Sequence, residues 1–122
     1  MSFGLHLMLD LSGCPEHVLE DLDEHFNFLN EMPSIIGMTK ITAPHVFRYS
    51  GLVPEDRGIT GTVIIAESHM SIHSFQEKGY CFIDVFSCNM FDVDTVIAEI
   101  ECRFQPTSIT QFKAIRGKDF PR

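Results

Sequence analysis

Hydrophobic and polar positions follow two different periods along this chain. Residues 3–11 alternate, with Phe3 and four leucines on one face, which is typical of a half-buried β-strand. Over residues 16–32 the apolar side chains recur at helical spacing, opposite acidic residues that we expect to be solvated. The pattern therefore predicts a strand followed by an amphipathic helix. The apolar positions of this helix are Val18, Leu19, Leu22, Phe26 and Leu29.

Proline and glycine mark where the helix and the next strand are interrupted. Pro33 and Gly37 are expected to close the helix. Residues 39–49 have a strand pattern, and Pro44 within them indicates an edge or bent strand, because proline lacks the N–H that a ladder requires. The turn-rich, charged residues 50–58 are expected to form a surface loop, of the kind that often rims a functional site.

Three apolar runs follow, at residues 59–66, 69–75 and 80–88. Residues 76–79, which end in a glycine, predict a hairpin turn between the last two runs. The run from residue 80 is largely apolar on both faces, which is the pattern of a central strand covered on both sides.

The C-terminal part of the chain predicts one more helix and one more strand. Asp92 is expected to be the N-cap of a helix that Pro106 ends, residues 107–116 form the last strand, and the tail from Gly117 is loose. The predicted fold is α+β, a two-layer sandwich in which two helices cover one face of a mostly antiparallel sheet. The doubly apolar strand needs a cover on the other face, so we expect a homodimer with a four-layer arrangement.

The composition fits one globular domain spanning residues 1–122, with 44% apolar and 21% charged residues. The net charge of −8 argues against nucleic acid as a partner, because its phosphates would be repelled. No apolar run is long enough to span a bilayer and the first residues lack a signal-peptide pattern, so we expect a cytoplasmic protein without membrane contact. The four cysteines lack C-x-x-C spacing and are expected to be free thiols.

Four residues that carry chemistry lie within seven positions: Glu67, Ser68, His69 and His73. A conventional serine hydrolase is not supported, because Ser68 lacks a G-x-S-x-G elbow and is followed by more β pattern. The two histidines share a strand face, but no cysteine or carboxylate stands at a recognisable ligand spacing, so no metal is expected. By their local spacing alone, the four residues could also be polar side chains at the end of a strand.

Three motifs in this part of the chain, taken together, carry a more specific signal. They read Ala66-Glu67-Ser68-His69-Met70-Ser71-Ile72-His73, then Glu77-x-Gly79-Tyr80, then Asp84-Val85-Phe86-Ser87-Cys88. In this combination the chain resembles the prokaryotic S-adenosylmethionine decarboxylase proenzyme family, over most of its length. The resemblance implies a self-cleaving enzyme of spermidine biosynthesis that carries a pyruvoyl cofactor and decarboxylates S-adenosylmethionine.

The resemblance also implies how the chain processes itself. Ser68 Oγ would attack the carbonyl of Glu67 in an N-to-O acyl shift, which gives an ester. His73 would remove the Ser68 α-proton, so that β-elimination frees the Glu67 carboxylate. Two chains would result, residues 1–67 and 68–122, and the second would begin with the pyruvoyl group derived from Ser68.

Further roles follow from the same resemblance. Thr60 stands where the family usually has a serine that assists processing, and it retains the hydroxyl. The pyruvoyl ketone would form a Schiff base with the substrate amine, and Cys88 matches the acid that reprotonates the substrate Cα. Glu77 matches a carboxylate that contacts the substrate ribose. From the residues alone, Cys88 could also be a small buried hydrophobe and Glu77 a turn residue. Asp84 lies among apolar neighbours and needs a partner, which the sequence does not reveal.

Departures from the family pattern bear on the substrate. The family places an aromatic residue that stacks on adenine about six positions before Thr60, where this chain has Pro54, and it commonly has glycine at Asn89. Phe47 and Tyr49 could replace that aromatic residue only if the loop is longer and folds back. The carboxylates after Pro54 would suit a basic amino acid. Two alternatives therefore stay open: a pyruvoyl-dependent arginine or ornithine decarboxylase, and a non-catalytic α+β binding or regulatory module.

Overall fold

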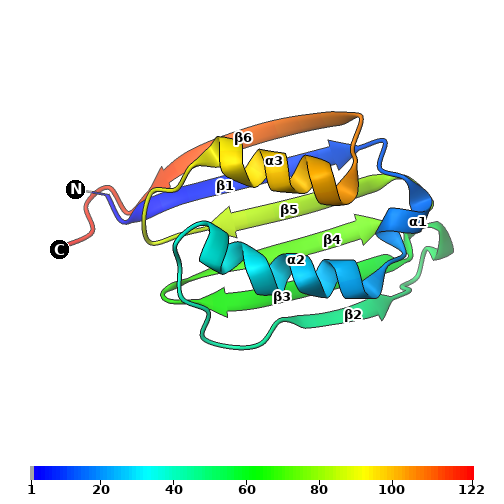
Figure 1. Cartoon of the computed structure of the whole chain (residues 1–122), viewed down its shortest axis with the longest axis horizontal. Helices are drawn as coiled ribbons and strands as arrows, with labels where there is room; N and C mark the ends of the chain where they lie inside the picture. Colours follow the sequence, from blue (N-terminus) through cyan, green and yellow to red (C-terminus); the bar gives the residue numbers. More distant parts are fainter. Residues whose placement is uncertain (1) are drawn as a thin grey trace.

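The alternating segments of the sequence build one antiparallel sheet in the computed structural model, which describes residues 2–122. Its six strands lie in the order β2-β3-β4-β5-β1-β6 (Figure 1), and every neighbouring pair is antiparallel. The strands are β1 (Gly4–Ser12), β2 (His45–Tyr49), β3 (Gly58–Ile65), β4 (Ser68–Phe75), β5 (Tyr80–Phe86) and β6 (Ser108–Arg116). The predicted α+β class and antiparallel sheet are confirmed.

Two main helices, α2 (Leu22–Ile35) and α3 (Val93–Phe104), lie across the same face of the sheet, as Figure 1 shows. A short helix, α1 (Glu16–Leu19), precedes α2, and a 3-10 turn, η1 (Pro54–Asp56), lies in the loop before β3. Within residues 2–122, no helix combines the length and hydrophobicity needed to cross a membrane. The leucines of β1 face the helices and are at most 3% exposed, namely Leu5, Leu7, Leu9 and Leu11.

The helix predicted over residues 16–32 is wrong in its continuity. The chain leaves helical geometry at Asp21, whose carboxylate caps α2 by accepting the N–H of Glu24 at 3.0 Å. Because the helix restarts there, the residues of α2 that face the sheet differ from those that one continuous helix would bury. Phe26, expected in the core, is 38% exposed, and His25 is fully buried instead. A local cap therefore overrides the longer apolar pattern.

The predicted end of this helix is also wrong, because Pro33 lies inside α2 rather than after it. Proline near a helix end removes only one hydrogen bond, and the buried ring of Pro33 contributes to packing. The helix ends at Ile35, and Gly37 follows with a left-handed φ of 78°. The second main helix starts as predicted, with the Asp92 carboxylate accepting the N–H of Asp94.

Two strands are shorter than their apolar runs. Strand β2 begins at His45 rather than at residue 39, immediately after Pro44, and it is an edge strand as expected. Strand β5 ends at Phe86, so Cys88 lies just beyond the ladder. The prediction that β5 is central is confirmed by its place between β4 and β1.

The tail from Gly117 is tied down rather than loose. The guanidinium of Arg122 donates to the carbonyl oxygens of Phe3 at 2.5 Å and Cys88 at 3.0 Å. The ring of Phe120 packs edge-on against Phe3, with 4.9 Å between ring centroids. The terminal position of the segment suggested mobility, whereas the structure supplies partners for both the Arg122 cation and the Phe120 ring.

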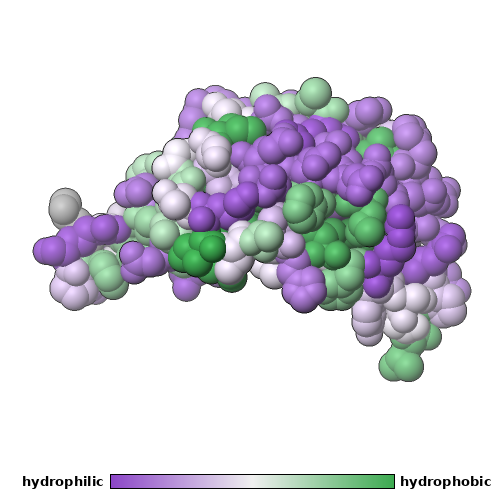
Figure 2. Space-filling model, turned by 60° about the horizontal axis from the view of Figure 1, so that its bottom comes forward, coloured by the Kyte–Doolittle hydropathy of each residue, from purple (hydrophilic) through white to green (hydrophobic). Residues whose placement is uncertain are grey.

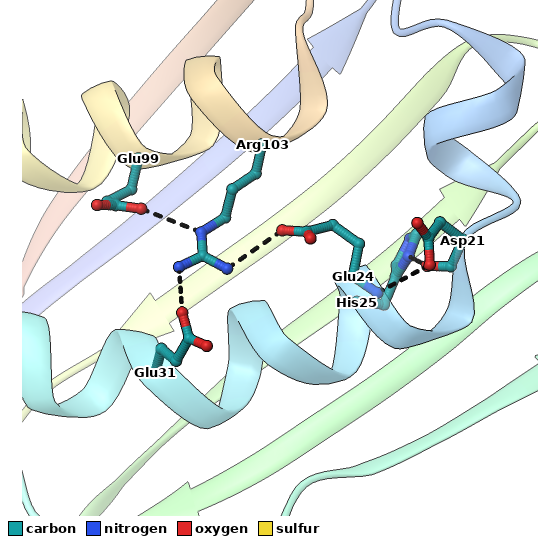
Figure 3. A network of polar contacts seen from close by, with 6 residues as sticks. All are labelled: Asp21, Glu24, His25, Glu31, Glu99 and Arg103. Carbon is teal, nitrogen blue, oxygen red and sulfur yellow. Dashed lines mark hydrogen bonds and ion pairs between the residues drawn. The ribbon is translucent and has the colours of Figure 1, made fainter.

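One arginine joins the two main helices. Arg103 of α3 donates to Glu24 and Glu31 of α2, at 3.1 and 2.5 Å, and to Glu99 of its own helix at 3.0 Å. Figure 3 shows its guanidinium between the two helices, surrounded by these carboxylates. The Arg103 side chain is only 15% exposed, so the network is shielded from water more than an ordinary surface ion pair is. Part of the acidic face of α2 is therefore a helix contact rather than solvated surface.

The sheet face away from the helices is open in this chain. Alternation places one side chain in two on this face, and several large ones are exposed by 42–59%: Phe47, Tyr49, Ile64, Phe82 and Phe112. Figure 2 turns the β2 edge forward and shows, on that edge rather than on the open face itself, hydrophobic patches among larger hydrophilic areas. Strand β5 is thus central in the sheet, yet only one of its two faces is covered within the chain.

Candidate active site

The stretch with the predicted cleavage point is a hairpin turn. Residues 66 and 67 form a two-residue turn between β3 and β4, and Ile65 pairs with Ser68 across it. The peptide bond between Glu67 and Ser68 therefore lies where the chain reverses. Such a tight turn presents this bond at the end of the sheet, and the flanking ladder holds it in place.

Ser68 and Cys88 are brought together at this end of the sheet. Ser68 is 7% exposed, and its Oγ accepts the backbone N–H of Cys88 at 2.7 Å. The Cys88 thiol donates to the carbonyl oxygen of Ala66 at 3.3 Å, and the side-chain amide of Asn89 lies 3.8 Å from the same sulfur. The contact joins the ends of β4 and β5, two neighbouring strands.

Cys88 differs from the other three cysteines by its surroundings. All four are free thiols, but Cys14 and Cys81 are buried. Burial raises the pKa of the Cys14 thiol to about 11, and raises that of Cys81 well above its usual range. Cys102 is exposed on α3. Cys88 is thus the cysteine that combines partial exposure with contact to the turn.

Thr60 and His73 form a second cluster, away from Ser68. They are paired across β3 and β4, and Thr60 Oγ1 lies 3.1 Å from His73 Nδ1. His73 is five residues along β4 from Ser68, which corresponds to about 16 Å of strand. Five is an odd number, so the two side chains also leave opposite faces of the sheet. Ser68 points to the helix side, and His73 points to the open side.

A cavity of about 590 Å³ adjoins the Thr60–His73 pair. Its wall includes Phe47 and Tyr49. From the sequence, these two residues could stack on adenine only if the loop after them is longer and folds back. The loop does fold back, because Tyr49 pairs with Gly58 and Phe47 with Thr60 in the β2–β3 ladder. The remaining lining residues are Gly51, Leu52, Val53, Asp56, Gly58, Ser74 and Phe75.

Glu77 lies outside this cavity lining. Its carboxylate accepts a hydrogen bond from the Arg57 guanidinium at 2.7 Å, and the neighbouring Lys78 forms an ion pair with Asp56. The two ion pairs attach the loop before β3 to the turn between β4 and β5. The structure therefore places Glu77 in a loop contact, at the rim of the region where the substrate is expected.

Asp84 lies half-buried on the open face, opposite Ser71 of β4 and Met8 of β1. Its negative charge acts on His6 of β1: burial lowers the pKa of His6, while the charge of Asp84 acts to raise it.

Comparison with known proteins identifies the family. A family model described as S-adenosylmethionine decarboxylase matches residues 5–117. The chain belongs to the S-adenosylmethionine decarboxylase family. Its members are pyruvoyl-dependent carboxy-lyases made as proenzymes, and a serine of the chain gives rise to the pyruvoyl group.

Individual relatives agree with this assignment. The S-adenosylmethionine decarboxylase proenzyme of Thermococcus onnurineus is 30% identical over 112 residues, 88% of this chain and 75% of that protein. The proenzyme of Methanococcus vannielii is 32% identical over 93% of this chain and 89% of that protein. For the Thermococcus kodakarensis proenzyme, 33% identity extends over 71% of this chain but 57% of that protein, so the match spans little more than half of the relative.

The fold agrees as well. The crystal structure of the adenosylmethionine decarboxylase from Aquifex aeolicus superposes with a TM-score of 0.77 and 26% identity, covering 95% of this chain and 92% of that one. This chain thus shares its fold with a solved adenosylmethionine decarboxylase over nearly its whole length.

Sequence reasoning missed two features of this family member. The first is the role of backbone atoms, since the Cys88 N–H and the Ala66 carbonyl make the contacts that join the turn to β5. No side-chain motif signals such contacts. The second is Ser74, which lines the cavity and bonds to the buried His25. Ser74 could have been found only by knowing which residues of α2, His25 among them, face the sheet.

Proposed function

We propose that this chain is a self-processing, pyruvoyl-dependent decarboxylase that acts on S-adenosylmethionine. The observation that carries the proposal is the contact at the hairpin turn between the Ser68 hydroxyl and the Cys88 backbone, in a chain of this family. The residues at the turn suit a pyruvoyl group formed there, because Ser68 is next to the bond to be cut and a thiol lies beside it.

The first step would use only atoms of the chain. Ser68 Oγ adds to the Glu67 carbonyl carbon, the C–N bond breaks, and an ester with a free amine on Ser68 results. A base then takes the Ser68 α-proton, and elimination releases the Glu67 carboxylate. Water hydrolyses the resulting enamine with loss of ammonia, which leaves the ketone. The Cys88 N–H supports the first step by orienting the attacking oxygen.

Cys88 would act after processing, as the acid of the decarboxylation. The pyruvoyl ketone supplies an electron sink for the bond that breaks as carbon dioxide leaves. The Cys88 thiol is held beside the turn by its bond to the Ala66 carbonyl oxygen, within reach of a substrate joined at residue 68. A free thiol is most readily kept reduced in a reducing compartment, which favours the cytosol as the place of action.

The position of His73 bears on which group removes the Ser68 α-proton. Within one chain His73 is about 16 Å along β4 from Ser68 and on the opposite face, too far for proton transfer. We infer that a homodimer, with two open faces packed together, brings the His73–Thr60 pair of one copy to the turn of the other. The exposed aromatic residues of that face favour such packing.

The same arrangement would complete the substrate site. The cavity beside His73 offers Phe47 and Tyr49 as platforms for the adenine ring, whereas its Asp56 carboxylate is already paired with Lys78. S-adenosylmethionine carries both an adenine and a sulfonium cation. Arginine or ornithine would need a free carboxylate in this cavity, whereas the two aromatic walls favour the nucleoside.

Denaturing mass spectrometry tests self-processing. The wild-type chain is expected as two fragments, residues 1–67 and 68–122, and Ser68→Ala is expected to remain whole. Carbon dioxide release is then measured with S-adenosylmethionine, arginine and ornithine side by side. An intact wild-type chain after prolonged incubation would overturn the proposal, and release from an amino acid alone would overturn the substrate.

Mixed dimers test the origin of the base. Differently tagged Ser68→Ala and His73→Ala chains, each inert alone, are expressed together. If His73 acts across the interface, the His73→Ala chain is cleaved, because its Ser68 meets the His73 of the other copy. If His73 acts within its own chain, neither chain is cleaved and the dimeric mechanism fails.

A further inference from the structure

A buried histidine of α2 reaches the strand pair that carries Thr60 and His73. His25 has none of its surface exposed, and Ser74 of β4 is 3% exposed. His25 Nε2 lies 2.9 Å from Ser74 Oγ, and its Nδ1 lies 2.7 Å from the Asp21 carbonyl oxygen. Figure 3 shows His25 beside Asp21 at the start of α2. Both ring nitrogens of a fully buried imidazole therefore have partners, as burial requires.

The available protons fix the direction of each hydrogen bond. The Asp21 carbonyl oxygen can only accept, so His25 Nδ1 carries the proton and Nε2 of the neutral ring accepts. Burial lowers the pKa of His25, which favours this neutral form. The Ser74 hydroxyl then donates to His25 Nε2 at 2.9 Å, because that nitrogen needs a donor, rather than to the Ile59 carbonyl oxygen 3.4 Å away. Its oxygen remains free to accept the backbone N–H of Ile59, which lies 3.3 Å away.

Ser74 thereby replaces a ladder hydrogen bond where the β3–β4 pairing stops. Thr60 and His73 are the last paired residues in this direction, and Ile59 and Ser74 follow immediately. Ile59 is fully buried, so its N–H would lack a partner without the hydroxyl. The contact clamps β3 to β4 one residue beyond the Thr60–His73 pair.

We propose that His25 and Ser74 are positioning residues that set the orientation of the His73 imidazole. Neither touches the reacting atoms; His25 orients the Ser74 hydroxyl, Ser74 holds Ile59, and the adjacent Thr60–His73 hydrogen bond keeps its geometry. The inference rests on the proposed function, because it concerns the elimination step that uses His73.

The test compares Ser74→Ala with Ser74→Thr, which keeps the hydroxyl. Ser74→Ala is expected to slow self-cleavage by about tenfold or more, since small misplacements of a catalytic group are costly. The ester should accumulate and be cut by hydroxylamine, because only the His73 step is impaired. Ser74→Thr should restore the wild-type rate. The Ser74→Ala/His25→Leu double variant should be no slower than Ser74→Ala alone, as expected of two residues that act as a unit.

Val96→Ala is the matched control. Val96 is fully buried in α3, so its truncation should lower the stability of the protein without touching the β3–β4 pair. An unchanged rate in Ser74→Ala, or equal slowing in Val96→Ala at the same loss of Tm, would overturn the proposal.

Two measurements that need no enzyme activity distinguish failure of the positioning role from failure of the proposed function. In a Ser68→Ala chain, which cannot cleave, Ser74→Ala should speed amide hydrogen exchange at Ile59 and shift the NMR signals of His73. Unchanged exchange and signals would refute the positioning role even if the wild-type enzyme is active. A wild-type chain that never cleaves, with the expected shifts present, would refute the proposed function alone.

Discussion

Cys88 contacts the hairpin turn through two different atoms. Its N–H donates to Ser68 Oγ, and its thiol donates to the Ala66 carbonyl oxygen. The first contact belongs to the backbone and survives any substitution of the side chain, whereas the second belongs to the thiol. Self-cleavage and decarboxylation should therefore respond differently to a change at this position.

Cys88→Ala is expected to self-cleave at a near-normal rate, because the N–H that orients Ser68 remains. Its kcat should fall by roughly 10²- to 10⁴-fold, the usual contribution of a positioned general acid. Mass spectrometry measures cleavage, and carbon dioxide release measures kcat. Cys102→Ala, at an exposed position on α3, is the control and should behave as wild type. Normal turnover in Cys88→Ala would remove the thiol from the acid role.

Tyr49→Ala is expected to raise KM for S-adenosylmethionine while self-cleavage continues. Base stacking on an aromatic ring contributes ~1–3 kcal/mol, which corresponds to roughly 5- to 150-fold in affinity. Tyr49→Phe keeps the ring and should leave KM near its wild-type value. Steady-state kinetics of the processed enzyme would decide, and equal KM values for all three proteins would exclude Tyr49 as an adenine platform.

At the scale of elements, the break between α1 and α2 decides what the sheet meets. The Asp21 cap restarts the helix, which turns His25 toward β4 and Phe26 toward solvent. An imidazole is thereby packed between α2, the sheet and α3, where it lies against Phe104 with 5.3 Å between ring centroids. Docking of α2 should then depend on the protonation of this ring.

The pH dependence has a definite sign. Burial lowers the pKa of His25; Asp21 acts to raise it, Arg48 acts to lower it, and Ser74 and Phe104 add no charge. The unfolded chain thus binds the proton more readily than the folded one. The contribution of neutral His25 to the free energy of unfolding is complete above its unfolded pKa of about 6.5. It is lost as the pH falls below that value.

Urea unfolding at fixed protein concentration, from pH 8 to pH 5, provides the measurement. The free energy of unfolding of wild type should fall faster with decreasing pH than that of His25→Leu, in which the titrating group is absent. Parallel pH profiles for the two proteins would contradict the role of His25.

At the scale of the whole molecule, helices cover one face of the sheet and leave the other face exposed. The two main helices cover the core side, whereas aromatic side chains remain exposed on the open side. The two candidate clusters, Ser68 with Cys88 and Thr60 with His73, lie at different places on the sheet within one chain. A second copy would resolve both observations at once.

Phe82→Glu places a charge at the middle of the open face, on the central strand. It is expected to shift the protein from dimer to monomer in sedimentation velocity, because burying an unpaired carboxylate in the interface is costly. Self-cleavage should be lost together with the dimer. Phe26→Glu, at an exposed position of α2 on the other side, should remain dimeric and cleave. A wild-type chain that sediments as a monomer and still cleaves would contradict the arrangement.

The sequence by itself determined the strand pattern, most of the element order and the family. Alternation placed the β1 leucines in the core, and the motif around Glu67–Ser68 identified the family that the comparisons confirm. These features are local, because periodicity and short motifs depend on neighbours along the chain. Where local rules compete, as at Asp21 and Pro33, the predicted boundaries were wrong.

Only the tertiary structure decided which residues meet. The contact of Ser68 with the Cys88 backbone, the His25–Ser74 pair and the return of Tyr49 to the cavity all join segments that are distant in sequence. Ladder register and helix phase set such contacts, and a shift of one residue in either would reverse the faces. The motif Glu67-Ser68-His69 therefore marks where cleavage is expected, while the separation of Ser68 from His73 is the tertiary observation on which the proposed dimeric site rests.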